Sequence, residues 1–178
     1  MPGGYYHVHT RGNDRQDIYF GNWSGRLFLR ELERVVVRYG WRILAYCLMP
    51  NHVHLLVETE TPNLGRGVHW LHGQYAQYFN QKYGRVGHLF QSRFGARVLH
   101  DEVQVANALA YVAANPVVAA LCARPEDWEW SSYSDTISVA RHPLIDLARL
   151  RAFLHAADTC ARAIVRERLL SAGLLAPG

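Results

Sequence analysis

The sequence is poor in the residues that stabilise small secreted proteins and in the segments that cross membranes. Its 178 residues include only three cysteines, far apart and odd in number, which excludes a disulfide framework and a cysteine-based zinc site. No apolar run approaches the roughly 18 residues of a spanning helix. Residues 1–5 lack the basic and apolar regions that begin a secretory signal. We therefore expect a protein of the reducing cytoplasm.

Lysine is nearly absent, because Lys82 is the only lysine among 19 basic residues, and the formal net charge is a modest +4. Residues 1–100 hold 12 Lys and Arg against 6 Asp and Glu, whereas residues 101–178 hold 7 against 9. Arginine is well suited to binding phosphates and stacking on bases. A GC-rich coding bias would explain the arginines equally well, so the charge alone does not establish a polyanionic partner.

The hydrophobic content of 49% is sufficient for a packed core, and the length fits one domain. Periodicity and turn residues predict the order strand, helix, strand, strand, helix, strand, helix. This order favours an α+β fold in which helices face an antiparallel sheet. The expected strands are 5–10, 41–49, 52–59 and 93–99, and the expected helices run from residue 22 or 24 to 39, over 62–83 and over 101–114. A helical extension over 136–178, interrupted near 157–158, follows a domain of residues 1–135.

Two His-x-His triplets are the first candidates for chemistry: His7 with His9, and His52 with His54. Residues two apart on a strand share a face, so each pair of imidazoles can converge on a divalent ion. Ten histidines in a chain of this length give roughly 0.6 such pairs by chance, so the spacing alone also fits ordinary strand histidines. In the second triplet the opposite strand face is apolar and suits a covering helix. That face carries Val53, Leu55 and Val57.

A second candidate lies in the last expected helix, where Tyr111 and Asn115 are four residues apart and share a helix face. A phenol beside an amide oxygen is an arrangement that can serve as nucleophile and metal ligand. The alternative is a core aromatic residue and a helix-ending asparagine. Pro116 favours that alternative, since proline disfavours helical geometry in the residue before it.

A third feature is the segment 81–94, in which cations alternate with aromatic residues and glycines. Such a mixture can bind a nucleic-acid strand, with charges for the phosphates and rings for the bases. A solvated loop between a helix and a strand explains the same composition. His69 and His72, three residues apart on a helix, have no third partner nearby and are interpreted as ordinary histidines.

Taken together, these segments resemble the REP-associated tyrosine transposases, relatives of the IS200/IS605 insertion-sequence transposases. The resemblance covers about residues 5–135, and the run Met-Pro-Asn-His-Val-His at 49–54, followed downstream by a tyrosine and Asn-Pro, is its most specific part. The other matching stretches are 6–13, 45–56, 75–80, 87–94, 111–116 and 130–133.

The resemblance implies a ferredoxin-like α+β fold of the HUH nuclease class, with a C-terminal helical extension in this chain. It implies that His52, His54 and Asn115 bind Mg²⁺ or Mn²⁺ and that Tyr111 is the nucleophile. The relatives cleave single-stranded DNA beside hairpins, form a 5′-phosphotyrosine and can rejoin strands. The expected partner is therefore a REP-like palindrome, bound by a monomer or homodimer that associates with the nucleoid. DNA contacts are expected from Arg11, Asn13, Lys82, Arg85, His88, Gln91 and Arg93.

Two departures from the family pattern stand out. Position 9 is histidine where a polar residue such as threonine is commoner, which creates a second triplet beside the family's own. Residues 136–178 are not covered by the motifs. Three alternatives remain at this point: an autonomous insertion-sequence transposase with a swapped, dimeric active site, a non-catalytic hairpin-binding protein that has lost its activity, and an unrelated metal-dependent hydrolase that uses both His triplets with water as nucleophile.

Overall fold

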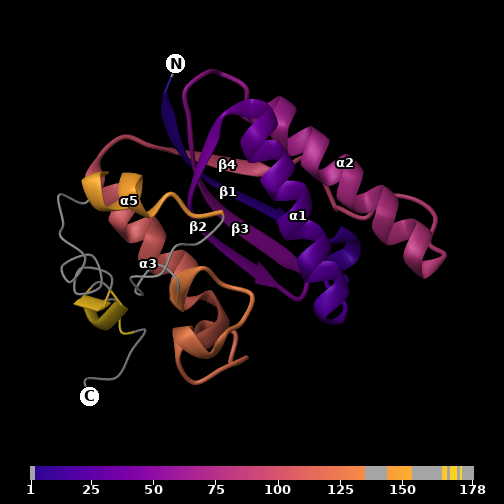
Figure 1. Ribbon diagram of the computed structural model, residues 1–178. Helices are drawn as coiled ribbons and strands as arrows, with labels where there is room; N and C mark the ends of the chain where they lie inside the picture. The colour runs from indigo at the N-terminus through magenta and orange to yellow at the C-terminus, as the bar shows by residue number, and fades with distance from the viewer. Residues whose placement is uncertain (1–2, 135–143, 154–165, 168, 172, 174–178) are drawn as a thin grey trace.

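The computed structural model describes residues 3–134, 144–153, 166–167, 169–171 and 173, in which one antiparallel sheet is covered by helices on both faces (Figure 1). The elements are β1 (Gly4–Arg11), α1 (Gly21–Tyr39), β2 (Trp41–Met49), β3 (His52–Thr59), α2 (Leu64–Tyr83), β4 (Gly95–Leu99), α3 (Glu102–Val118) and α5 (Leu147–Phe153), with short 3-10 helices at Asn13–Arg15 and Pro125–Asp127.

The strand order across the sheet is β2-β3-β1-β4, and all neighbours are antiparallel. The order of elements from β1 to β4 is βαββαβ, the ferredoxin-like arrangement. The expected α+β fold is thus confirmed. β1 lies between β3 and β4, so residues from three separate parts of the chain meet around it.

Local sequence signals explain where the helices begin and end. α1 ends before Gly40 and α2 before Gly84, with φ of 65° and 60° at the two glycines, a left-handed geometry that glycine adopts without steric cost. α3 begins after Asp101, whose carboxylate accepts a hydrogen bond from the Gln104 backbone N–H at 2.7 Å. These ends agree with the turn residues of the sequence.

Two boundaries differ from the sequence expectation. β4 begins at Gly95 rather than at residue 93. α3 continues through Pro116 to Val118 instead of ending at 114. Proline removes one backbone donor, but Pro116 is itself buried in the last turns of a helix whose inner face is packed against the sheet, and this packing outweighs the lost hydrogen bond.

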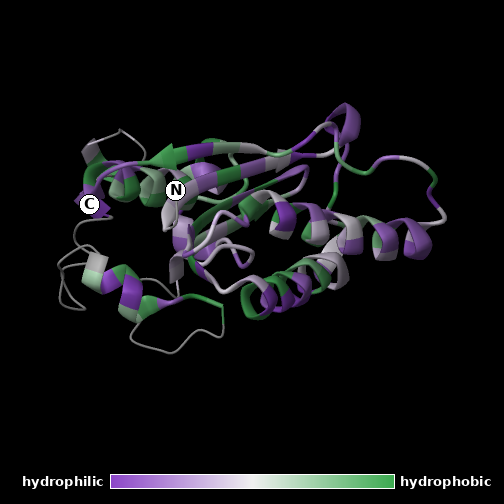
Figure 2. Ribbon diagram, turned by 90° about the horizontal axis from the view of Figure 1, so that it is seen from above, coloured by the Kyte–Doolittle hydropathy of each residue, from purple (hydrophilic) through white to green (hydrophobic). Residues whose placement is uncertain are grey.

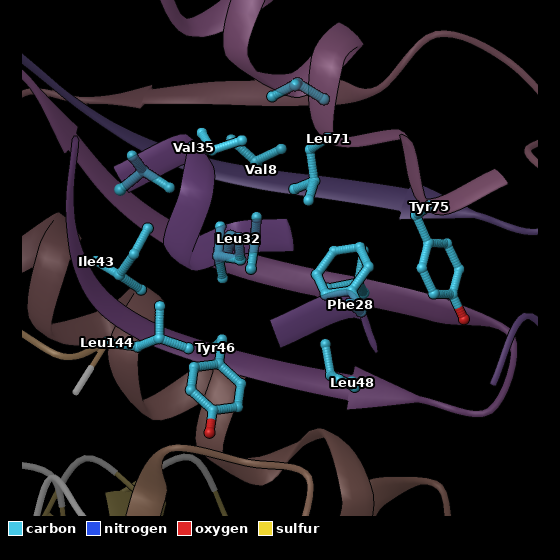
Figure 3. Packing of buried hydrophobic residues seen from close by; sticks show 14 of the residues in the cluster. Val8, Phe28, Leu32, Val35, Ile43, Tyr46, Leu48, Leu71, Tyr75 and Leu144 are labelled. Atoms are coloured by element: carbon cyan, nitrogen blue, oxygen red, sulfur yellow. The ribbon is translucent and has the colours of Figure 1, made fainter. Parts of the chain in front are cut away.

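The larger core lies between the sheet and the pair α1 and α2 (Figure 3). Phe28 and Leu32 of α1 pack with Leu71 and Tyr75 of α2, and all four side chains are fully buried. Each contributes about 1.5 to 3 kcal/mol through burial. The Tyr75 hydroxyl donates a hydrogen bond to the backbone carbonyl of Ile18, which satisfies the one polar atom in this group.

The opposite face of the sheet is covered only in part. α3 packs on β2 and β3, where Leu109 contributes to a second apolar cluster with Leu44 and Leu56. The helices carry hydrophobic and hydrophilic residues side by side, as Figure 2 shows, which fits packing on one side and solvent on the other. Tyr5 and Leu99 also pack on the cluster under α3, but the part of the same face of β1 and β4 that carries His9, Arg11 and Arg97 is exposed beside it.

The described beginning of the C-terminal extension runs along the β2 edge. Ile145 forms a parallel bridge with Ile43, and Arg149 of α5 bonds the Glu58 carboxylate at 2.7 Å and the Tyr5 hydroxyl at 2.6 Å. α5 confirms helix over 147–153. The expected interruption near 157–158 lies outside the described residues, and the division at residue 135 stays a prediction.

Candidate active site

The two His triplets lie on the same face of the sheet, toward α3. In the antiparallel pairing of β1 and β3, His9 stands opposite His54 and Arg11 opposite His52. Side chains alternate along each strand, so Val8, Val53 and Leu55 point into the core instead. The apolar face expected for the second triplet is confirmed. The first triplet, which is not part of the ligand set that the resemblance implies, faces the same space as the second.

His54 is the most buried of these histidines, and His7 contacts it directly. The His7 Nε2 and His54 Nδ1 atoms are 3.0 Å apart. Burial, with the charges of His7 and His52 adding to it, lowers the pKa of His54 to about 3. Burial, His9 and Arg97 lower the pKa of His7 to about 4. Both rings are therefore neutral at pH 7, and a His54 that donates its Nδ1–H to His7 keeps the Nε2 lone pair for a ligand.

His52 is held by two amide side chains. Its Nδ1 lies 2.7 Å from the Asn51 Oδ1, and it also hydrogen-bonds the Asn115 side chain. Burial and the charge of Arg11 lower the pKa of His52, although the bond to Asn115 opposes this. Its ring centroid is 5.0 Å from that of His54, with the two rings nearly perpendicular. The family histidines thus converge on a common space.

α3 brings Tyr111 and Asn115 to this space. The Tyr111 ring lies 5.4 Å from His54 and 5.5 Å from His7, measured between centroids, and its side chain is 50% exposed. Asn115 donates from Nδ2 to the Tyr111 carbonyl at 2.7 Å, within the helix. The two interpretations that the sequence left open, a core tyrosine and a helix-ending asparagine, are both wrong, because Tyr111 is half-exposed and α3 continues beyond Asn115.

These residues line a cleft of about 1060 Å³ between α3, β1 and β4. Gly95 forms part of the floor, and a Cβ there would collide with the His9 ring, 2.1 Å away. Three arginines line the described cleft, and no Asp or Glu does. A space with this lining favours an anionic occupant. The arginines are Arg11, Arg93 and Arg97.

The expected DNA-contacting residues fall into two groups. Arg11, Gln91 and Arg93 line the cleft. Asn13 and His88 are absent from its described lining, although the Asn13 N–H bonds the Leu89 carbonyl at 2.8 Å and the two segments run side by side. The cleft residues that sequence reasoning missed include Arg97 and Asn107.

Lys82 and Arg85 lie outside the cleft, at the end of α2. Lys82 lies over the Trp23 ring at 5.7 Å, and Arg85 lies over the Phe79 ring at 5.9 Å. Around them is a cluster of partly exposed aromatic side chains that contact one another. These three are Phe20, Trp23 and Tyr83, each about 40% exposed. We call this group the aromatic cluster.

The described residues contain no group of three His, Cys, Asp or Glu side chains arranged to hold a metal ion. The metal-ligand set that the resemblance implies is not a group of this type, because it combines two histidines with the amide of an asparagine. Imidazole and amide oxygen are both ligands for divalent ions. No helix in the described part of the chain combines the length and apolar character needed to cross a membrane.

The model of the IS200-like transposase family matches residues 2–115, which is more than half of the chain. The chain belongs to the IS200-like transposase family. The expected resemblance is confirmed, and the matched region ends at Asn115, so it includes both family histidines and Tyr111.

Two similar proteins accord with this assignment. A protein of Haemophilus influenzae described as a REP-associated tyrosine transposase is 26% identical over 153 residues, covering 79% of this chain and 86% of that one. The structure of a REP-associated tyrosine transposase bound to a REP hairpin matches with a TM-score of 0.68 at 16% identity, covering 81% of this chain and 85% of that chain. The second match supports the fold of this IS200-like transposase.

Proposed function

We propose that this IS200-like transposase cleaves single-stranded DNA beside a hairpin and rejoins strands through a covalent 5′-phosphotyrosine on Tyr111. The observation that carries the proposal is the position of the half-exposed Tyr111 ring, 5.4 Å from His54, in a cleft lined by arginines. An exposed phenol beside neutral histidines can reach a backbone phosphate that the arginines attract.

His52, His54 and Asn115 would hold a divalent ion such as Mg²⁺ or Mn²⁺. The hydrogen bonds of Nδ1 in both histidines leave Nε2 as the ligand atom, and the bond between His52 and Asn115 brings the amide next to the ring. A bound ion would stabilise the charge that develops on the scissile phosphate.

The chain's own residues account for the rest of the reaction. The Tyr111 oxygen attacks phosphorus and loses its proton, and the bond from phosphorus to the 3′ oxygen breaks, which releases a 3′-OH. The phosphotyrosine keeps the phosphodiester bond energy. A 3′-OH held in the cleft can therefore attack it and restore a continuous strand.

The substrate proposed is a REP-like palindrome with unpaired flanks. The relative with the matching fold was solved with a REP hairpin, and the cleft of this chain lies beside a partly exposed tyrosine that can meet an unpaired backbone. Arg93 and Gln91 in the cleft would contact the unpaired strand. Lys82 and Arg85, beside the aromatic cluster, would contact the hairpin instead.

One observation favours the alternative of a metal-dependent hydrolase that uses both His triplets, because both triplets face the same cleft. A hydrolase of this kind needs a base for water, which a neutral histidine of the cleft could supply, so the two routes are distinguished by the covalent adduct. The covalent route uses Tyr111, whose half-exposed ring contacts those of His7 and His54.

The proposal is tested by incubating the full chain with Mn²⁺ and an end-labelled oligonucleotide that carries a hairpin and single-stranded flanks. We expect a protein–DNA adduct on a denaturing gel and a free 3′ fragment. A perfect duplex of the same sequence is the control and should give neither. Cleavage without any adduct would favour the hydrolase, and binding without cleavage would favour a non-catalytic hairpin-binding protein.

A further inference from the structure

The open face of β1 and β4 gives the cleft two ends, and an arginine stands at each. The register places Arg97 opposite His7 and Gly95 opposite His9. Arg11 lies four residues beyond His7 on the same strand and points to the same face. At about 3.3 Å per residue, the two arginines are separated by about 13 Å along the sheet. His9 and His54 lie between these two levels of the sheet, and Tyr111 of α3 contacts the rings of His7 and His54.

No contact within the described part of the chain gives Arg97 a structural role. Within the described part of the chain it has no hydrogen bond or ion pair, although it is exposed in the cleft wall. Arg42 and Arg149 differ in this respect, because both pair with Glu58. A free guanidinium on a wall without carboxylates is well placed to bind a phosphate.

Asn107 lies beside the same end of the cleft, one helical turn before Tyr111 on α3, and is also exposed. Residues four apart share a helix face, so its amide points along the cleft from the nucleophile. The neighbouring Gln104 is not available in the same way, because its amide bonds the Asp101 carboxylate at 2.9 Å. Arg97 and Asn107 therefore offer a charge and an amide at one end.

We propose that Arg97 and Asn107 form a nucleotide-binding subsite on the side of the scissile phosphate opposite to Arg11. The single strand lies along the open β1–β4 face, with Arg11 binding the flank on one side of Tyr111 and Arg97 binding the flank on the other. This inference rests on the proposed function. It explains how both ends of a cleaved strand stay in place for rejoining, since held reactants meet far more often than free ones.

The test uses the two product flanks as separate probes. The cleavage position is first mapped with the unmodified protein. Binding of one oligonucleotide ending in the 3′-OH and one beginning with the 5′ phosphate is then measured at several salt concentrations, in the full chain carrying Tyr111→Phe. The added substitutions are Arg97→Gln, Arg11→Gln and, as a matched control, Arg26→Gln, which removes an exposed arginine from α1 on the other face of the sheet.

We expect a reciprocal pattern. Arg97→Gln should weaken one flank about 5- to 10-fold and reduce its salt slope by about 0.7, the value for one phosphate contact on a single strand. Arg11→Gln should weaken the other flank, Arg26→Gln should change neither, and Asn107→Ala should affect the same flank as Arg97→Gln. Equal effects of Arg97→Gln and Arg26→Gln, or weakening of the same flank by Arg97→Gln and Arg11→Gln, would overturn the subsite.

Failure of the proposed function and failure of the subsite give different results. If the unmodified protein forms no adduct with a hairpin oligonucleotide, the proposed function and the subsite are both overturned. If it forms the adduct and the flank pattern is absent, only the subsite is wrong. Thermal unfolding of each variant checks the fold, and because both arginines are exposed we expect melting temperatures close to that of the parent.

Discussion

His7 offers a sharp test of how the site is held, because it touches His54 and Tyr111 without belonging to the proposed ligand set. His7→Ala removes the 3.0 Å hydrogen bond to His54 Nδ1 and the edge contact with the Tyr111 ring, whose centroid is 5.5 Å away. A neutral hydrogen bond contributes about 0.5 to 1.5 kcal/mol, and an aromatic contact contributes about the same.

Together, the lost hydrogen bond and the lost ring contact predict that His7→Ala raises the activation free energy by about 1 to 3 kcal/mol, which lowers the cleavage rate about 5- to 150-fold. It should appear mainly as a higher Mn²⁺ requirement, since groups that orient a metal-binding histidine alter metal affinity by about 10- to 100-fold. His7→Gln should recover part of the loss, because its amide oxygen can accept the His54 N–H. A purely structural role would give no such recovery.

The assay is the rate of adduct formation with one hairpin oligonucleotide over a range of Mn²⁺ concentrations. His9→Ala is the matched control, since its ring lies 6.3 Å from that of His54, and its rate should stay within about twofold of the parent. A His7→Ala rate equal to the parent at every Mn²⁺ concentration would show that His7 does not support the metal site. So would a His9→Ala loss as large as that of His7→Ala.

Three further predictions follow from the same geometry. His54→Ala should reduce cleavage by about 100-fold or more, because a missing ligand costs several kcal/mol of charge stabilisation, and excess Mn²⁺ should restore part of the rate. Arg93→Gln should weaken binding of an unstructured single strand whereas Arg85→Gln should weaken only hairpin DNA; equal effects in a filter-binding assay would contradict the separation of the two residues. Glu58→Gln should lower the free energy of unfolding by about 1 to 3 kcal/mol at pH 7. Burial raises the pKa of the Glu58 carboxyl, but the bonds to Arg149 outweigh burial and hold this pKa below its usual value. The ionised Glu58 carboxylate therefore stabilises the fold fully above the pKa that it has in the unfolded chain. This stabilisation is lost as the pH falls through its lower pKa in the folded protein, so the denaturant curves of mutant and parent should converge in acid.

Local patterns in the sequence were enough to predict most of the fold. Alternation predicted β1 and a short apolar run predicted β2, and glycines after apolar helices predicted the ends of α1 and α2. The spacing of His52 and His54 gave a shared strand face because alternation is a local property. The length of α3 was harder to predict, since burial of its inner face overrides the local preference at Pro116.

The sequence could not predict which distant segments meet at the cleft. His9 and His54 face one another only because β1 pairs with β3 in this register, and register is set by non-local packing. Arg97 joins the cleft for the same reason, through the pairing of β4 with β1. Lys82 and Arg93 are close in sequence, but the end of α2 and the loop that follows separate them in space.

The most direct test of the central claim is mass spectrometry of the protein after reaction with a hairpin oligonucleotide and Mn²⁺. Digestion with protease and nuclease should leave a peptide that contains Tyr111 with one 5′-linked nucleotide on the phenol oxygen, and Tyr111→Phe should abolish this mass while retaining hairpin binding. A nucleotide attached to Tyr75, Tyr78 or Tyr83, or an adduct that survives in Tyr111→Phe, would contradict the account.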